Sequence, residues 1–587
     1  MNVYRRLKEL LNAGQKRKVI GLIIMIFFGA LLETLGVSII VPLVSAVVSP
    51  DKIMGSEAAQ KALRLVGMGG MDSDAFVRIL LISVIVIYVV KTVYMLVLAY
   101  IQAGFITTTE ADTSIRLLGE YLNRPYEYYL SADVNVMFQT INKDIPHVFE
   151  LLQEVMRLIT EILVSICLCV FLLIVDFKMT LSIAALLVIL VCFVVLFLKP
   201  LLGNLGQERV KQQVSTMKWM QQGIFGIKDV KVADREGYFL EVFSKAYRSL
   251  AGVTRKYTVL NNAPRLVIEM LCIVGMMGYM LLVVLRGEDM ASMLTPLSAF
   301  AMAAVRLMPS VNRISTHLST IAYYEPSLNY ICDNLNVSKL KDSEVPTTAG
   351  EKKKASDQPM TLTKEIRLKG IEYHYPGTEK EIFQGAEMVI PAGASVGIVG
   401  TSGAGKTTIV DILLGLLSPQ KGQVTCDGRD IKDDYAGWLH NLGYIAQNIY
   451  MLDTTIRENV AFGVLAEDVN EDRIWEVLRE AQMEEYVHSL PEGLDTVIGD
   501  RGVRISGGQR QRIGIARALY SDPELLVFDE ATSALDNDTE AAIMDAINSL
   551  KGRKTMIIIA HRLKTIENCD MIYRVEGGKI ERTTVEA

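Results

Sequence analysis

Residues 394–408 read ASVGIVGTSGAGKTT, a short apolar run that leads into the pattern G-x-x-x-x-G-K-[ST]. The pattern spans Gly400 to Thr407, and residues 409–417 continue it as an apolar, helix-compatible stretch. Glycines in such a loop let backbone N–H groups approach phosphate oxygens, and the dipole of the following helix attracts the same anion. We therefore expect a strand, a nucleotide-binding loop and a helix in that order.

The chemistry of this loop requires a cation and a hydroxyl at fixed places. We expect Lys406 to reach the β- and γ-phosphates of ATP and the Thr407 hydroxyl to bind Mg²⁺. The residues that we assign to nucleotide contacts in the loop are Gly400, Ser402, Gly403, Ala404, Gly405, Lys406, Thr407 and Thr408.

A second apolar run, 525–528, ends in two adjacent carboxylates, Asp529 and Glu530. A buried strand of this kind delivers both side chains to one edge of a sheet. We expect Asp529 to hold the Mg²⁺ shell and Glu530 to polarise the attacking water as general base. The pair follows a phosphate-binding loop, which makes it a strong indication of nucleotide hydrolysis.

Between these motifs the chain reads Ile505-Ser506-Gly507-Gly508-Gln509. Ser-Gly-Gly-Gln at this place resembles the signature of the ABC ATPase family, with Ile505 where leucine is usual. The resemblance implies that Ser506, Gly507, Gly508 and Gln509 belong to the ATP site and face the γ-phosphate across a dimer interface. A catalytic site then needs the loop of one subunit and the signature of another.

Further positions match this family residue by residue. Tyr375 resembles the aromatic residue that stacks on adenine, and Gln447 resembles the glutamine that senses Mg²⁺ and links to the membrane domain. Asp536 resembles the interface aspartate, and His561 resembles the switch histidine that contacts the γ-phosphate. The resemblance therefore adds Gln447 and His561 to Glu530 as catalytic residues. The stretch 496–502 resembles a loop that touches coupling helices in exporters.

The first half of the chain has a different composition. The chain has 587 residues, of which 50% are hydrophobic, and its net charge of −6 gives no reason to expect a nucleic-acid partner. Its mean hydropathy is +0.29. Six apolar runs are long enough to cross a membrane; they lie near 19–48, 76–104, 155–175, 179–198, 265–285 and 290–311. We expect a membrane domain over 1–335, a linker over 336–362 and a nucleotide-binding domain over 363–587.

Basic residues set the expected orientation of these spans. They gather in residues 1–18 and in 199–262, so both stretches are expected in the cytoplasm, together with both termini. The stretches 105–154 and 199–262 favour long helices that project beyond the bilayer, with short helices near 125–132 and 222–231. Residues 3–14 have one apolar face and favour a helix lying in the cytoplasmic interface.

Charged residues inside spans are costly and are candidates for function. They are Glu33, Lys91, Glu269 and Arg306, with Arg265 at a span entrance. Two interpretations stay open. The three cations can share one cavity and bind a phosphate or pyrophosphate, or the two acids can pair with them as structural bridges.

Six spans followed by one nucleotide domain resemble the type IV ABC exporters, with a helical membrane domain and an α/β P-loop ATPase domain. Residues 305–314 and Ala263-Pro264-Arg265 are similar to bacterial flippases of lipid-linked oligosaccharides. This resemblance implies a homodimer in the bacterial inner membrane that uses ATP and Mg²⁺ to move a glycolipid or other amphipathic substrate through the lipid bilayer. A broad exporter of hydrophobic drugs or lipids and an ATP-gated channel or sensor remain as alternatives.

Overall fold

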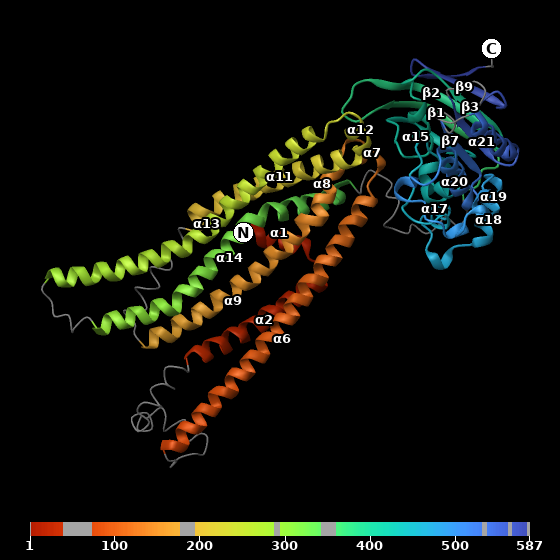
Figure 1. Cartoon of the computed structure of the whole chain (residues 1–587). Coiled ribbons are helices and arrows are strands. Elements are labelled where there is room, and N and C mark those ends of the chain that lie inside the picture. The colour runs from red at the N-terminus through yellow and green to blue at the C-terminus, as the bar shows by residue number, and fades with distance from the viewer. Residues whose placement is uncertain are drawn as a thin grey trace. The chain divides into compact units, whose positions relative to one another are not determined.

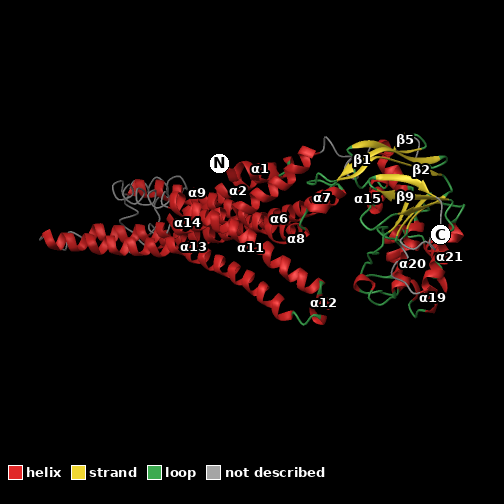
Figure 2. Cartoon of the chain, turned by 90° about the horizontal axis from the view of Figure 1, so that it is seen from above, coloured by secondary structure: helices red, strands yellow, loops and turns green. Residues whose placement is uncertain are grey.

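The computed structural model of the chain describes residues 2–38, 73–175, 194–286, 294–341, 360–530, 537–560 and 566–583. Its contacts divide the chain into two units. The helical unit comprises Met1–Leu122 and Asp133–Lys341, and the α/β unit comprises Asn123–Ala132 and Asp342–Ala587. Figure 2 shows that the strands belong to the α/β unit.

The helical unit is built from long helices (Figure 1). Helices α6 and α13 have 50 and 51 residues, about 75 Å each at 1.5 Å per residue, well over the ~30 Å of a hydrocarbon core. The prediction of long helices is thus confirmed, and their projection beyond the bilayer stays a prediction. The elements are α1 (Asn2–Leu10), α2 (Ala13–Ser38), α6 (Ser73–Leu122), α8 (Val134–Gln139), the π-helical turn η1 (Thr140–Asp144), α9 (Ile145–Val175), the π-helical turn η2 (Val194–Leu198), α11 (Lys199–Phe225), α12 (Ile227–Val232), α13 (Glu236–Arg286) and α14 (Leu294–Lys341).

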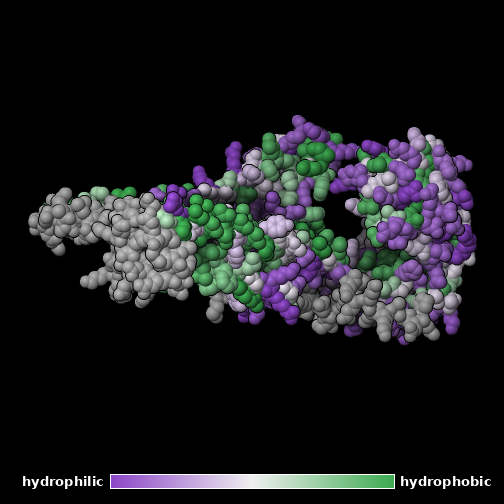
Figure 3. Space-filling model, turned by 90° about the horizontal axis from the view of Figure 1, so that it is seen from below, coloured by the Kyte–Doolittle hydropathy of each residue, from purple (hydrophilic) through white to green (hydrophobic). Residues whose placement is uncertain are grey.

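Two stretches among the described residues are long and apolar enough to cross a membrane, Ala13–Gly36 and Val77–Leu122. None of the most apolar window of the second stretch is buried, as expected for a helix that faces lipid. In the view of Figure 3, hydrophobic side chains gather over the helical unit, while the α/β unit is mostly hydrophilic. Most of the predicted span 179–198 lies outside the described residues.

Helix α1 is partly covered by protein. Its residues Leu7, Leu10 and Leu11 are buried, and α1 packs against α14. Arg6 forms an ion pair of 2.6 Å with Asp333 of α14. Protein therefore covers these three leucines of the apolar face, whereas Tyr4 of the same face is exposed. The place of α1 in the cytoplasmic interface stays a prediction. Helix α14 also continues to Lys341, through the first residues of the predicted linker.

The α/β unit alternates strands and helices from β1 onward. It contains α7 (Tyr126–Ser131), β1 (Glu365–His374), β2 (Glu381–Pro391), β3 (Ser395–Val399), α15 (Lys406–Leu413), β4 (Lys421–Cys426), β5 (Arg429–Asp430), η4 (Ile431–Asp434), α16 (Tyr435–His440), β6 (Leu442–Ile445), α17 (Ile456–Val460), η5 (Ala466–Asp468), α18 (Glu471–Glu480), α19 (Glu484–Ser489), η6 (Gly493–Asp495), η7 (Asp500–Gly502), α20 (Gly507–Tyr520), β7 (Leu525–Asp529), α21 (Asn537–Leu550), β8 (Thr555–Ile559), β9 (Met571–Glu576) and β10 (Lys579–Thr583).

Two sheets organise this unit. The larger has the order β10-β9-β3-β8-β7-β6, and its neighbours from β9 to β6 are parallel. Strands β7 and β8 are buried at every position, as expected for a parallel sheet that is covered on both faces. The smaller sheet, β2-β1-β4-β5, is antiparallel. Because β3 and β7 are parallel members of one sheet, the loops after them lie at the same carboxyl edge, where ligands bind in α/β folds.

Candidate nucleotide site

The loop after β3 requires its glycines. A Cβ built on Gly400 would lie 2.5 Å from the carbonyl oxygen of Val575, which leaves no room for a side chain. Gly403 and Gly405 have φ angles of 79° and 105°, which L residues rarely adopt. Helix α15 begins directly after this loop at Lys406. The loop therefore has the tight backbone that the sequence predicts for binding phosphate.

Lys406 is buried in this loop. Its Nζ donates to the carbonyl oxygens of Gly400 and Thr401 at 2.9 and 3.2 Å. Thr407 is exposed in the first turn of α15, while Thr408 is buried. The Thr408 hydroxyl and the Tyr375 hydroxyl lie 2.9 Å apart. Tyr375, expected at the adenine, is therefore held beside the phosphate-loop helix.

Two carboxylates end strand β7, as expected. Asp529 is buried, and burial raises its pKa, although a hydrogen bond from Tyr444 opposes the shift. Gln447 Nε2 donates to Glu530 Oε2 at 2.7 Å. Glu530 has a φ of 50°, a strained backbone conformation that proteins keep mostly at functional sites. The structure thus brings the predicted metal carboxylate, general base and sensing glutamine together.

These residues fit a magnesium nucleotide. No group of three or more His, Cys, Asp or Glu able to hold a metal occurs within the described part of the chain. Mg²⁺ in nucleotide sites is typically held by one or two carboxylates and by substrate phosphates, which a dedicated all-protein cage does not require. The buried Asp529 and the exposed Thr407 supply oxygen ligands of the type that Mg²⁺ prefers.

The signature residues begin helix α20. Ser506 Oγ accepts from the backbone N–H of Gln509, and Gln509 Oε1 accepts from the backbone N–H of Ser506, which forms a capping box. The side chain of Gln509 is therefore used to start the helix. A Cβ on Gly514 would lie 2.3 Å from Ile449, so α20 packs closely on the segment after Gln447. Gly507 and Gly508 form the first turn, whose N–H groups suit an anion.

Three predicted residues stay untested by this geometry. Asp536 and His561 lie outside the described residues. Arg306 lies within helix α14, but the placement of its side chain is likewise outside the description.

The structure describes the surroundings of several predicted cavity residues of the helical unit. Arg265 forms an ion pair of 3.0 Å with Glu269, one turn away on α13. Lys91 on α6 lies against Gly36 of α2, and its Nζ is 5.5 Å from the centre of the Tyr88 ring. Glu33 lies one turn before Gly36 on α2. The Arg265–Glu269 pair agrees with the structural interpretation, and for Lys91 both interpretations stay open.

Sequence reasoning missed charged pairs between α9 and α14. Arg313 pairs with Glu161 at 2.7 Å, and His317 contacts Glu154, which also pairs with Arg157. Glu161 lies inside the predicted span 155–175, so the rule that identified Glu33 should have identified it too. These pairs join two helices that pack together along their length.

A buried arginine joins three helices further along the same unit. Arg209 on α11 is 3% exposed, and its Nη2 donates to Ser327 Oγ of α14 at 2.7 Å. Ser327 Oγ donates in turn to Asp144 Oδ1 at 2.6 Å. Burial lowers the pKa of Arg209 and raises that of Asp144. No sequence signal marks this network, because its members are distant in the chain.

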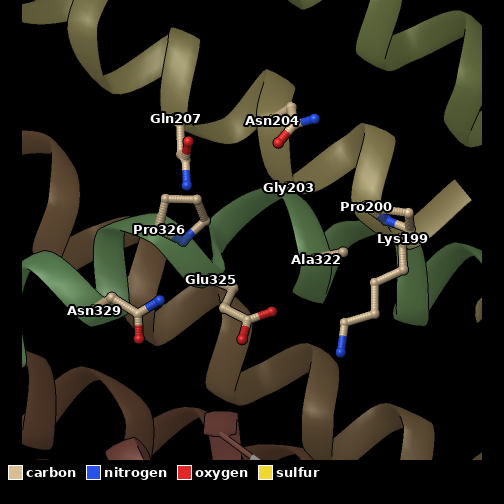
Figure 4. A pocket seen from close by; sticks show the side chains of 9 residues that line it. All are labelled: Lys199, Pro200, Gly203, Asn204, Gln207, Ala322, Glu325, Pro326 and Asn329. Atoms are coloured by element: carbon tan, nitrogen blue, oxygen red, sulfur yellow. The ribbon is translucent and has the colours of Figure 1, made fainter.

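A pocket of about 360 Å³ lies between α11 and α14. In Figure 4 the side chains of Lys199 and Glu325 extend to the same side of this pocket. Asn204, Gln207 and Asn329 also line it. None of the predicted cavity residues belongs to the lining of this pocket.

Comparison with known proteins places both halves of the chain. The family model described as ABC transporter matches residues 383–533, and the model described as ABC transporter transmembrane region matches residues 19–289. The uncharacterized ABC transporter ATP-binding protein YwjA of Bacillus subtilis is 42% identical over 217 residues. That match covers 37% of this chain and 37% of the Bacillus protein, little more than a third of each.

Two other proteins match over most of the chain. The ATP-dependent lipid A-core flippase of Desulfotalea psychrophila is 28% identical over 526 residues, which is 87% of each chain. A solved structure of a bacterial Atm1-family ABC exporter with ATP bound superposes with a TM-score of 0.74 at 20% identity, over 97% of this chain and 96% of that one. The second likeness establishes the fold.

Proposed function

Because this chain belongs to the ABC transporter family, as an exporter with its transmembrane region and its ATP-hydrolysing domain on one polypeptide, we propose that it is a glycolipid flippase. Its substrate is a polyprenyl-pyrophosphate oligosaccharide or a similar lipid-linked glycan, moved from the cytoplasmic to the outer leaflet. The observation that supports this most is the similarity over 87% of each chain to a protein named as a lipid A-core flippase.

The α/β unit supplies the energy in this proposal. The backbone N–H groups between Gly400 and Gly405 and the ammonium of Lys406 bind the phosphates of ATP. Asp529 and Thr407 would hold Mg²⁺, which would neutralise phosphate charge. Glu530 accepts a proton from the attacking water, and the amide of Gln447, which donates to Glu530 at 2.7 Å, keeps that carboxylate oriented.

Two copies of the chain complete the two sites. In the family mechanism Ser506, Gly507 and Gly508 of one subunit face the γ-phosphate held by the other, with Asp536 and His561 at the same interface. The chain contains every one of these residues, so a homodimer has two competent sites. We place it in a bacterial inner membrane, with both termini and the α/β unit in the cytoplasm.

Recognition of the pyrophosphate is assigned to cations in the helical unit. Lys91 and Arg306 are the main candidates, because Arg265 already pairs with Glu269. The second candidate function is a broad exporter of hydrophobic drugs or lipids. The Arg265–Glu269 pair favours it, because an arginine that is neutralised by a glutamate makes the cavity less charged. The two functions differ in whether transport depends on the remaining cations.

The test measures ATP hydrolysis by the purified protein in lipid vesicles with and without a polyprenyl-pyrophosphate oligosaccharide. The glycolipid should stimulate the wild type but not Arg306→Ala, and Arg248→Ala, which removes an exposed arginine of α13, should respond like the wild type. Stimulation by apolar drugs in all three proteins, without a response to the glycolipid, would instead establish the hydrophobic exporter.

A further inference from the structure

The pocket between α11 and α14, which we call the α11–α14 pocket, combines two opposite charges with three amides. Lys199 and Glu325 extend to the same side of it, and the amide oxygen of Asn329 is turned to that side as well (Figure 4). No ion pair joins Lys199 and Glu325 among the residues that the structure describes. The amides of Asn204 and Gln207 complete the polar lining. Because the two formal charges cancel, this lining suits a neutral polar ligand better than an anion.

The amide of Asn329 lacks a partner inside the protein. Its Oδ1 is buried, yet it accepts no hydrogen bond within the described part of the chain. Other amides on the same two helices are hydrogen-bonded: Gln212 Nε2 donates to Glu208 Oε1 at 2.6 Å, and Asn334 Nδ2 donates to the carbonyl oxygen of Tyr330 at 3.0 Å. Buried polar atoms are almost always hydrogen-bonded. The Asn329 oxygen therefore indicates a donor that comes from outside the chain.

The α11–α14 pocket begins where an apolar run of the sequence ends. Lys199 directly follows the predicted span 179–198, and Gln207 lies eight residues further along α11, about 12 Å at 1.5 Å per residue. The polar layer on each side of a hydrocarbon core is roughly 5–8 Å thick. In the predicted orientation of the spans, the pocket therefore starts in the headgroup layer of the cytoplasmic leaflet. A lipid can place its headgroup there while its tail stays in the bilayer.

A sugar ring fits this lining chemically. Each sugar hydroxyl donates and accepts, as an amide side chain does, whereas the ammonium of Lys199 only donates and the carboxylate of Glu325 only accepts. Pro200, Pro326 and the bare backbone of Gly203 supply apolar surface for the C–H groups of a ring. The volume of about 360 Å³ lies within the range of small-ligand sites, about 300–1,000 Å³.

We propose that the α11–α14 pocket is a loading site, which binds a sugar of the glycolipid in the cytoplasmic leaflet before translocation. The proposal rests on the proposed function and adds a sugar site to it. Lys91 and Arg306, the cations assigned to the pyrophosphate, lie elsewhere: Ala322 of the pocket is 16 residues from Arg306 on α14, about 24 Å along the helix. A sugar linked directly to a pyrophosphate does not span this length, so the pocket and the cations bind the glycolipid in succession.

The first test fills the pocket and keeps its polar groups. A Cβ on Gly203 would meet only the carbonyl oxygen of Ala322, at 3.9 Å, so Gly203→Leu places its side chain in the pocket without disturbing the backbone. Gly252→Leu on α13, where a Cβ meets nothing within 4 Å, is the matched control. The probes are a polyprenyl pyrophosphate that carries an N-acetylglucosamine disaccharide and the same lipid without sugar. Their binding to the full-length, nucleotide-free protein is titrated by native mass spectrometry.

The wild type should bind the sugar-bearing lipid about 10-fold more tightly than the sugar-free lipid, as one or two net hydrogen bonds allow. Gly203→Leu should bind both lipids equally, and Gly252→Leu should keep the preference. Weaker binding of both lipids to Gly203→Leu would assign the pocket to the pyrophosphate or the tail and would overturn the sugar site.

The second test removes one amide at nearly constant volume. Because Asn329 Oδ1 has no partner in the described protein, Asn329→Leu should not lower the thermal midpoint. The preference for the sugar-bearing lipid should nevertheless fall about 3- to 10-fold. Asn261→Leu on α13 removes another buried amide oxygen without a described partner and should leave the preference unchanged. A preference that Asn329→Leu retains would leave water as the partner of this oxygen and overturn the inference, also where Gly203→Leu does not fold.

The sugar-free lipid distinguishes a failure of this inference from a failure of the proposed function. If the glycolipid stimulates ATP hydrolysis while the wild type binds both lipids equally, the flippase function stands and the loading site alone is wrong. If the wild type binds neither lipid and neither stimulates hydrolysis, the proposed function fails, and the loading site fails with it.

Discussion

The two units of this exporter use charge in opposite ways. In the α/β unit two charged groups of the candidate site, Asp529 and Glu530, stand at the end of the buried strand β7, where we propose that they face a ligand. In the helical unit the described buried charges mostly face one another, as Arg209 and Asp144 do through Ser327. A charged residue that pairs with another protein group stabilises the packing of helices. A charged residue at the edge of the sheet, beside the phosphate loop, is available to a substrate. The same residue type therefore predicts function in one unit and packing in the other.

The largest expected effect tests the charges aimed at a ligand. Glu530→Gln should lower the rate of ATP hydrolysis by about 10²- to 10⁴-fold, because the amide cannot accept a proton from water. ATP binding should persist, since the phosphate loop is unchanged. Turnover by the purified transporter is the measurement, with Glu567→Gln as the control at an exposed glutamate. A loss of less than about tenfold would remove Glu530 from the role of base.

The contrast between the units explains what the sequence can predict. Each described residue of the nucleotide site follows a buried strand or begins a helix, so its local pattern marks it. Arg209, Ser327 and Asp144 are 118 and 183 residues apart in the chain, and only the packing of three helices brings them together. The periodicity of a helix predicts on which face each residue lies, but it does not predict which other helix packs against that face.

Two single motifs show the same limit. Gln509 is predicted to belong to the ATP site, and its side chain also caps α20, because a Ser-x-x-Gln spacing satisfies a helix start. The apolar face of α1 predicts a helix in the membrane interface, and α14 packs against α1 while three leucines of that face are buried. An amphipathic pattern predicts that a face is covered and leaves the identity of the cover undetermined.

The second prediction tests the charges that face one another. Arg209→Met leaves Asp144 buried without its counter-ion, and breaking a buried pair costs about 3 kcal/mol or more. We expect the thermal midpoint of the purified protein to fall by roughly 5–10 °C. The double variant Arg209→Met/Asp144→Asn should recover most of this loss, because no uncompensated charge remains. If the double variant is instead less stable than either single one, the two groups do not act as a pair.

The third prediction concerns a carboxylate in the α/β unit that is not aimed at a ligand. Asp427 accepts from the backbone N–H groups of Thr363, Lys364 and Glu365 at 2.8, 2.8 and 2.9 Å. Burial alone would raise the pKa of Asp427, but these hydrogen bonds and that of the Thr363 hydroxyl outweigh it and lower the pKa. A lowered folded-state pKa stabilises the protein above the unfolded value of about 3.9, and this stabilisation is lost as the pH falls through the folded-state pKa.

Asp427→Asn should therefore cost about 1 kcal/mol at pH 7, a modest value because the group is partly exposed. The difference in thermal midpoint between the variant and the wild type should shrink as the pH falls below about 4. Asp468→Asn, at an exposed aspartate, is the control and should change the midpoint little at either pH. A difference that stays constant down to low pH would show that the charge of Asp427 is unimportant.

The smallest expected effect sharpens the comparison within the helical unit itself. Arg265 and Glu269 are side chains with exposures of 68% and 40%, one turn apart on α13. Such a pair contributes about 0.3–0.5 kcal/mol, so Glu269→Gln should shift the thermal midpoint by only about 1–2 °C.

Removing the Glu269 carboxylate also leaves Arg265 without this partner. If Arg265 serves substrate binding, Glu269→Gln should increase stimulation of hydrolysis by the glycolipid, whereas a purely structural pair predicts no change. In this view Glu269 and the substrate compete for the charge of Arg265. An increase in stimulation by the glycolipid assigns Arg265 to substrate binding, and no change assigns it to helix packing.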